Sequence, residues 1–267
     1  MGVVGLVVAA LVTAWAVVTV TFLVARVRRR YDTIDAAWGA GFAVIAAVTL
    51  LLSGPVSALS LTAVVLTVVW GGRLAGHVLR RSLSGPEDAR YAEMAAKASG
   101  DPGPRMYFRV YLTQAAVMWF VSLPVVFAAG ASGFEPAVSD GWANPWLWAG
   151  TALWVVGFGF ETVGDEQLRR FKADPANAGK VLDTGLWRYT RHPNYFGDAC
   201  VWWGLYLLAC STVLGPVTFL SPVLMTWLLA AGSGKPILER GLRQRRPDYA
   251  AYVDRTSGFL PWPPKRA

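Results

Sequence analysis

The sequence predicts an all-α membrane protein with about seven transmembrane helices, and both composition and hydropathy support this fold class. Hydrophobic residues fill 54% of the 267 positions and charged residues only 16%, whereas soluble proteins carry roughly a quarter of charged residues. Long apolar runs alternate with compact charged segments, which is the pattern of a polytopic membrane protein.

The predicted spans are stretches that approach the roughly 20 apolar residues needed to cross a bilayer. They are Val3–Ala25, Ala36–Ser53, Val56–Gly76, Tyr107–Ala129, Pro145–Val163, Tyr195–Cys210 and Val213–Ala231. The first lacks basic residues before its apolar run, so we interpret it as an uncleaved anchor rather than a signal peptide.

The distribution of basic residues predicts the orientation. Four arginines follow the first span and place that end in the cytoplasm: Arg26, Arg28, Arg29 and Arg30. Tracing the spans from there puts the N-terminus outside, the C-terminus inside, and all 25 Lys and Arg on or beside the cytoplasmic side. Glu135 and Asp140 are the charges of the opposite side. Anionic lipids and an anionic cofactor account for the net charge of +8 without a nucleic-acid partner.

The cysteines and histidines predict neither a disulfide nor a metal site. Cys200 and Cys210 lie ten residues apart on one predicted helix, which separates them by about 15 Å. The other residues of the kinds that commonly bind zinc are His77 and His192, and no metal-binding spacing joins them to the cysteines. Nothing in the sequence indicates the oligomeric state.

The cytoplasmic segment Gly164–Pro193 carries most of the information about chemistry. It continues a helix on which charged residues recur at spacings of three and four, and so share a face: Glu161, Asp165, Arg169 and Lys172. Ala173–Gly179 is predicted to be a loop because it contains proline, asparagine and glycine.

Six polar residues then gather at the entry to the sixth span: Arg188, Arg191, His192, Asn194, Tyr195 and Asp198. Pro193 suits the first turn of that helix, where its missing N–H costs little. A carboxylate about one turn into a span is costly unless it is bonded, which favours a functional role for Asp198. The alternatives are structural: Arg188 and Arg191 as leaflet anchors, His192 as a helix cap, and Tyr195 as an interfacial aromatic.

The run Gly185–Asp198 resembles the signature of the bacterial DUF1295 membrane proteins, within the steroid 5-alpha-reductase-like and sterol reductase superfamily. Four further segments extend the resemblance: Asp32–Trp38, Trp70–Arg73, Glu161–Lys172 and Arg245–Phe259. The core motif Arg-His-Pro-x-Tyr-x-Gly also occurs in isoprenylcysteine carboxyl methyltransferase-like proteins.

The resemblance implies one domain over residues 1–267, in the bacterial inner membrane, whose C-terminal half (145–267) binds NADPH from the cytoplasm. Asn194 and Asp198 match residues that hold the nicotinamide half, with Asp in place of the family's Glu. The other implied cofactor contacts are Arg73, Asp165, Arg169, Lys172, Arg188, His192 and Tyr249. Glu161 and Trp70 depart from the family pattern, which has Asn and a substrate-binding Tyr there. The basic C-terminal helix is either a lid over the cofactor or a lipid attachment.

Hydride transfer to an electron-poor C=C bond requires a nicotinamide close to the acceptor carbon and a donor at the carbonyl oxygen. Tyr195, Asp35 and Tyr107 are possible donors, and Tyr195 and Asp35 are our catalytic candidates. The alternative for Asp35 is an N-terminal cap of the second span.

The leading hypothesis is an NADPH-dependent reductase acting on a carbonyl-conjugated C=C bond of a lipophilic, steroid- or isoprenoid-like substrate. The second is an S-adenosylmethionine-dependent methyltransferase, and the third is a non-enzymatic lipid-binding membrane protein. The predicted partners are a lipophilic small molecule and membrane lipids. Preference for NADPH over NADH depends on the resemblance and on the abundance of arginine.

Overall fold

A computed structural model describes residues 1–83, 85–131 and 143–265, and the elements that it forms there are helices. The predicted all-α class is therefore confirmed. The chain divides into two compact units, and each is described by itself. The first comprises Met1–Leu147 and Leu205–Ser221, and the second comprises Trp148–Gly204 and Pro222–Ala267. A single functional domain over 1–267 stays a prediction.

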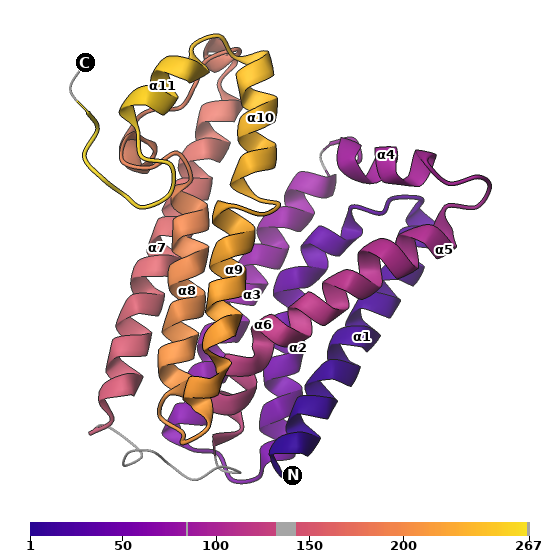
Figure 1. Cartoon of the computed structure of the whole chain (residues 1–267), viewed down its shortest axis with the longest axis vertical. Helices are drawn as coiled ribbons and strands as arrows, with labels where there is room; N and C mark the ends of the chain where they lie inside the picture. The colour runs from indigo at the N-terminus through magenta and orange to yellow at the C-terminus, as the bar shows by residue number, and fades with distance from the viewer. Residues whose placement is uncertain (84, 132–142, 266–267) are drawn as a thin grey trace. The chain divides into compact units, whose positions relative to one another are not determined.

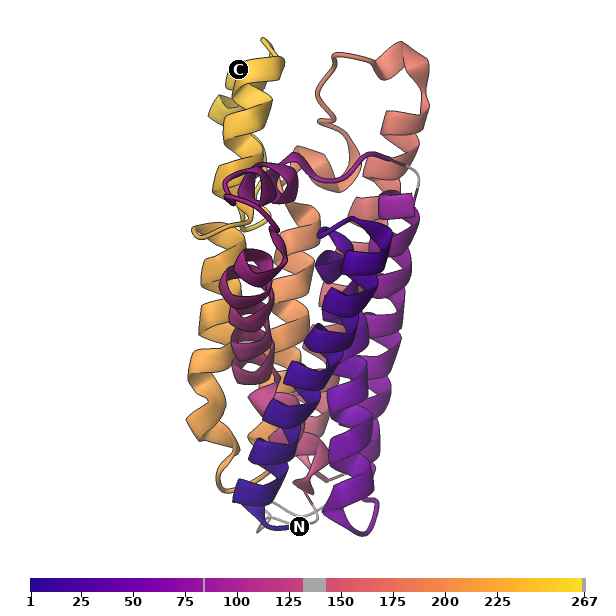
Figure 2. The same cartoon turned by 90° about the vertical axis from the view of Figure 1, so that its right-hand side faces the viewer.

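The first unit is a bundle of four long helices: α1 (Val3–Arg28), α2 (Thr33–Ser53), α3 (Ala58–Leu83) and α6 (Leu112–Ala129). Short elements complete it: α4 (Ala89–Ala96), α5 (Gly103–Met106), η1 (Tyr107–Tyr111) and η5 (Gly215–Phe219). α2 packs against α1, α3 and α6 (Figures 1 and 2). α2 and α3 approach so closely that a Cβ on Gly71 would lie 2.3 Å from the carbonyl oxygen of Gly39.

The second unit contains most of α7 (Pro145–Ala173), α8 (Pro193–Ala209) and α9 (Leu220–Ala230), together with α10 (Lys235–Arg245) and α11 (Tyr249–Arg255). Two short turns lie between α7 and α8: η3 (Pro175–Asn177) and η4 (Gly185–Arg188). α7 ends at Ala173 and α8 begins at Pro193, so the predicted loop and the predicted first-turn proline are both confirmed. Cys200 and Cys210 are buried and free.

Five segments of the described chain are long and apolar enough to cross a membrane, which marks the protein as an integral membrane protein. They are Val3–Arg28, Thr33–Ser53, Ala58–Leu83, Gly103–Ala129 and Gly215–Arg245. The other two predicted spans correspond to α7 and α8, and α8 has only 17 residues. The count of about seven spans and the N-outside orientation stay predictions.

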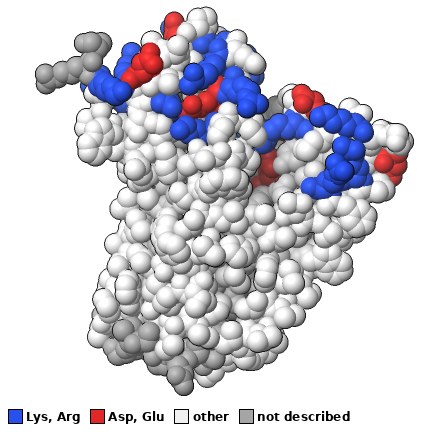
Figure 3. Space-filling view, in the orientation of Figure 1, with Lys and Arg blue, Asp and Glu red and all other residues white. Residues whose placement is uncertain are grey.

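Charged side chains gather at one end of each unit (Figure 3). In the first unit they lie over α4 and α5, and in the second over α10 and α11. Elsewhere on this face the surface is almost free of charge, as expected for surface in contact with lipid. Glu135 and Asp140, predicted to lie on the opposite side of the membrane, fall outside the described residues.

Candidate functional site

The packing of α7 against α8 positions the candidate site in the second unit. A Cβ on Gly157 would lie 2.5 Å from the carbonyl oxygen of Gly197, and one on Gly197 would lie 2.5 Å from the backbone nitrogen of Glu161. Real Cβ atoms do not approach backbone atoms this closely, so the two helices cross at a distance that only glycine permits. Figure 1 shows the two helices running alongside each other.

We expect Gly157→Ala to lower the free energy of unfolding by about 1–3 kcal/mol, because the added methyl group forces α7 and α8 apart. Gly159→Ala is the matched control: it lies on the same helix, and a Cβ there meets no atom within 4 Å. Unfolding midpoints in detergent micelles measure both effects. Equal effects of the two substitutions would contradict the close crossing.

The crossing brings together polar residues that are distant in sequence. The Asn194 side-chain amide donates a hydrogen bond to Oδ1 of Asp165 at 3.0 Å. Asp198, four residues further on α8, is 9% exposed, and Glu161 and Asp165 on α7 are 3% and 7% exposed. Two implied cofactor contacts, Asp165 and Asn194, are therefore joined by a hydrogen bond, and their role in binding a cofactor stays a prediction.

The loop between the two helices is held against α7 by its own hydrogen bonds. The indole of Trp187 donates to the carbonyl oxygen of Gly164 at 3.0 Å, and the amide of Leu186 donates to the side chain of Gln167 at 3.0 Å. The hydroxyl of Tyr252, on α11, donates to the carbonyl oxygen of Trp187. These bonds set the direction in which the chain enters α8.

Arg191 and His192 share one carboxylate from the tail. Nε of Arg191 donates to Oε1 of Glu239 at 2.9 Å, and Nε2 of His192 lies 3.0 Å from the same oxygen. Arg191 and His192 are 8% and 4% exposed. Arg191 is therefore a buried ion-pair partner and not an exposed leaflet anchor, and the His192 side chain binds Glu239 instead of capping α8. The His192 ring also stacks on Tyr195, with centroids 5.3 Å apart.

The buried imidazole of His192 makes stability depend on pH. Burial lowers the pKa of His192 below its ordinary value of 6.5, outweighing the opposing effect of Glu239. Between the lowered pKa and 6.5 the unfolded chain binds more protons, so the free energy of unfolding decreases as the pH falls through this range. Above 6.5 this stabilisation is fully present.

We expect His192→Gln to flatten the acid side of the stability profile, measured as unfolding midpoints from about pH 5 to pH 8. His77→Gln is the control and should keep the slope of the parent protein. Parallel profiles for the parent and His192→Gln would rule out His192 as the titrating group.

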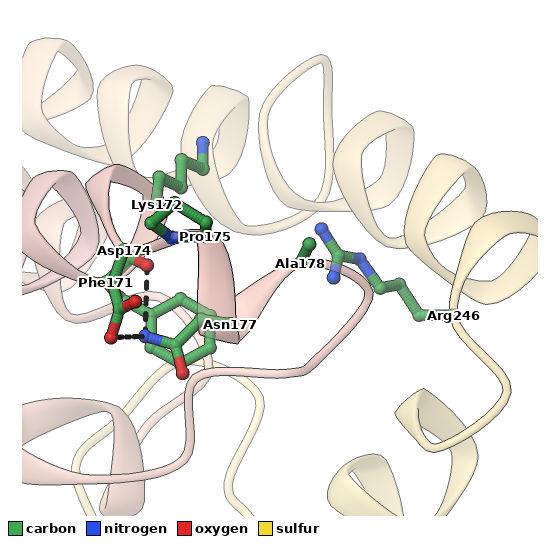
Figure 4. Close-up of a pocket in the computed structure, with 7 residues that line it drawn as sticks. All are labelled: Phe171, Lys172, Asp174, Pro175, Asn177, Ala178 and Arg246. Atoms are coloured by element: carbon green, nitrogen blue, oxygen red, sulfur yellow. Dashed lines mark hydrogen bonds between the residues drawn. The ribbon is translucent and has the colours of Figure 1, made fainter.

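The remaining basic candidates of this unit are more exposed. Arg169 is exposed and paired with Glu166, and Arg188 is exposed. Lys172 and Arg246 line a cavity of about 120 Å³ beside the η3 turn, on opposite sides of it (Figure 4). Tyr249 is only 2% exposed, so the structure places its side chain in the packing of the tail.

The candidate acid Asp35 belongs to the first unit. α2 begins at Thr33, so Asp35 lies in its first turn and is not the cap. Its Oδ1 accepts a hydrogen bond from the hydroxyl of Tyr91 on α4, and its Oδ2 lies 3.6 Å from Nη2 of Arg90. Burial, together with the Asp35 charge, raises the pKa of Tyr91, which keeps this phenol protonated.

The other first-unit candidates have different surroundings. The Tyr107 hydroxyl lies 3.0 Å from both the Trp15 indole nitrogen and the Thr19 hydroxyl oxygen. Trp70 is fully buried and packs against Phe42, and Arg73 is partly exposed.

Sequence reasoning missed two residues of these clusters, Glu239 and Tyr91. Glu239 lies in a strongly basic helix and was assigned to a lipid-binding or lid surface. The sequence signal for Glu239 is that it is an acidic residue among arginines, because an acidic residue is buried only when it is paired. Tyr91 is a large aromatic residue in an otherwise small and polar helix, which signals a buried position.

A family model described as "Protein of unknown function (DUF1295)" matches residues 21–256. The chain belongs to this family. The match includes α7, the loop and α8, and therefore every residue of the Asp165–Asn194–Asp198 cluster. The resemblance to DUF1295 proteins is thus confirmed.

Individual relatives share shorter or weaker similarity with this DUF1295 protein. An uncharacterized protein of Schizosaccharomyces pombe is 24% identical over 220 residues, which is 73% of this chain and 61% of the relative. A probable O-methyltransferase of Ustilaginoidea virens is 37% identical over 68 residues (26% and 24%). The 3-oxo-5-alpha-steroid 4-dehydrogenase 1 of Bos taurus is 32% identical over 78 residues (29% and 30%). Each alignment thus covers less than two thirds of the relative. No solved structure matches the chain.

Proposed function

We propose that this DUF1295 protein is an NADPH-dependent membrane reductase. It reduces a C=C bond conjugated to a carbonyl group in a lipophilic, steroid- or isoprenoid-like substrate, at the cytoplasmic side of a bacterial plasma membrane. The observation that carries the proposal is the hydrogen bond between Asn194 and Asp165, one turn before the buried Asp198. The partial similarity to a 3-oxo-5-alpha-steroid 4-dehydrogenase supports it.

The chemistry of these residues fits a nicotinamide dinucleotide. Asp165 and Asp198 supply carboxylate oxygens that accept from a carboxamide or a ribose hydroxyl, and Asn194 both donates and accepts. The N-terminus of α8 favours anionic or carbonyl groups. Lys172 and Arg246, beside their cavity, suit a phosphate. When bound, the cofactor supplies a hydride.

The remaining predicted residues divide between contact and positioning. Arg169 and Arg188 are exposed and available to phosphates, and Arg73 of the first unit enters the proposal through the family resemblance. His192 and Tyr249 are buried, so they act by holding the loop and the tail in place.

Tyr195 is proposed as the proton donor to a substrate carbonyl oxygen. It is half-buried and its ring is held by stacking on His192. Asp35, the other catalytic candidate, belongs to the first unit and accepts a hydrogen bond from Tyr91. The apolar surfaces of the spans exclude water and admit a lipophilic substrate from the bilayer.

The proposal is tested by identifying any small molecule that co-purifies. The protein is purified in mild detergent and denatured, and the released molecules are identified by mass spectrometry alongside Asn194→Ala and Asp198→Ala. NADP(H) from the parent and its loss from both variants is the expected result. Absence of nicotinamide cofactor, combined with no heat stabilisation by added NADPH, would overturn the proposal.

A methyltransferase using S-adenosylmethionine is the second candidate, because the chain is 37% identical to a probable O-methyltransferase over 68 residues. The same experiment distinguishes the two functions. S-adenosylmethionine or its demethylated product would be released from a methyltransferase. A protein that only binds lipid would release neither cofactor.

A further inference from the structure

The C-terminal tail of the second unit forms a cavity whose lining contains none of Asp165, Asn194 and Asp198. The cavity has a volume of about 380 Å³ and lies between the end of α11 and the tail. Its lining includes the cations Arg191, Arg255 and Lys265 and the turn Thr256–Gly258, with one acid, the exposed Asp254. Basic side chains beside a polar turn are the composition of a site for an anion.

Two cationic nitrogens converge on Gly258. A Cβ built on Gly258 would lie 2.7 Å from Nζ of Lys235 and 3.1 Å from Nη2 of Arg191. Glycine at this position therefore lets both cations approach the backbone more closely than a side chain would allow. Both side chains approach this one point of the tail from other parts of the unit, Lys235 from α10 and Arg191 from the loop before α8.

Lys235 retains hydrogen-bond donors, whereas Arg191 uses most of its own. Arg191 has five N–H donors, and four contacts use them: two to Glu239, one to the carbonyl of Val253 and one to that of Thr256. Lys235 is half-buried and has no carboxylate within ion-pair distance among the described residues. The three donors of Lys235 are thus available beside Gly258.

The backbone of the turn adds further donors. The amides of Ser257 and Gly258 make no hydrogen bond within the described ranges of the chain, while the carbonyl of Ser257 accepts from the amide of Arg191 at 2.9 Å. The ion pairs of the tail use other cations: Glu239 is shared by Arg191 and His192, and Asp183 is paired with Arg255.

We propose that a phosphate group binds in this cavity, held by Arg191 and the amides of Ser257 and Gly258, with Lys235 reaching it past Gly258. A phosphate presents several acceptor oxygens to converging N–H groups, and its charge balances the ammonium of Lys235. Its source is either a soluble nucleotide, in which case the inference rests on the proposed function, or the headgroup of an anionic lipid. The test involves no turnover, so its result is separate from that of the reductase test.

The test uses the full chain in an uncharged detergent. Thermal unfolding is followed while inorganic phosphate is titrated against chloride at constant ionic strength. We expect phosphate to stabilise the parent, and Lys235→Gln and Gly258→Ala each to weaken the apparent affinity by about tenfold or more, since a charge-assisted contact is lost or the methyl group displaces Lys235 and Arg191. Lys235→Arg should retain binding. Arg243→Gln, an exposed arginine on the same helix, is the matched control and should bind as the parent does.

The source of the phosphate is identified by competition. NADP+ competing better than NAD+ assigns the site to a nucleotide phosphate, and micelles containing phosphatidylglycerol competing better than phosphatidylcholine assign it to lipid. The proposal is overturned if phosphate stabilises the parent no more than chloride does, or if Lys235→Gln and Gly258→Ala bind as tightly as the parent. Far-ultraviolet circular dichroism confirms that each variant is folded. If Lys235→Gln does not fold, Gly258→Ala against Arg243→Gln decides the question.

Discussion

Replacing Glu239 with glutamine is expected to lower the free energy of unfolding by about 3 kcal/mol, because it leaves the buried Arg191 guanidinium without its carboxylate. Both side chains of this pair are 9% exposed. Removing one partner of a buried pair costs far more than removing one partner of an exposed pair. Denaturant unfolding in micelles, followed by the fluorescence of the 13 tryptophans, measures the change.

The matched control for this prediction is Glu166→Gln. Glu166 binds two basic side chains, Arg169 and Arg170, at 2.6 Å, and Glu239 likewise binds two, but all three side chains of the Glu166 cluster are exposed to solvent. Water screens such pairs, and the control should unfold close to the parent. Comparable effects at Glu166 and Glu239 would show that the tail is not locked to the loop through a buried charge.

Replacing Asn194 with alanine is expected to weaken NADPH binding by about 10- to 100-fold, the range expected for losing a hydrogen-bonding group that contacts charged partners. The substitution removes the proposed contact to the cofactor and also the hydrogen bond that orients Asp165. Equilibrium titration of NADPH into the purified protein, followed by nicotinamide fluorescence, gives the dissociation constants.

Two variants separate a binding role from a structural one. Gln244→Ala removes an exposed amide from α10 and should leave the affinity unchanged. Asn194→Asp keeps the volume but places a second carboxylate against Asp165, so it should also weaken binding. If Asn194→Ala unfolds like the parent and binds NADPH equally well, the cofactor is held elsewhere.

Local sequence signals predicted where the helices of the candidate site begin and end. The end of α7 at Ala173 and the start of α8 at Pro193 were both predictable, because proline, glycine and asparagine act through their own backbone preferences. The separation of Asn194 and Asp198 by one turn likewise follows from helix geometry alone. The helix limits in the first unit were less accurate: α3 continues seven residues past the predicted Gly76 to Leu83, because Arg80 and Arg81 lower the hydropathy of its last turns.

The sequence by itself determined the all-α class, the apolar spans, the basic ends and which polar residues stand at the entry to α8. These properties depend on composition and on neighbours within a few residues. Tertiary structure alone decided which charges pair: Glu239 with Arg191, 48 residues apart, and Tyr91 with Asp35, 56 residues apart. Such pairs form because burying an unpaired charge or hydroxyl is costly, and each side chain takes the partner that the folded helices bring within reach. The close approach of α7 to α8, which joins Asn194 to Asp165 across 29 residues, is likewise encoded by no local pattern.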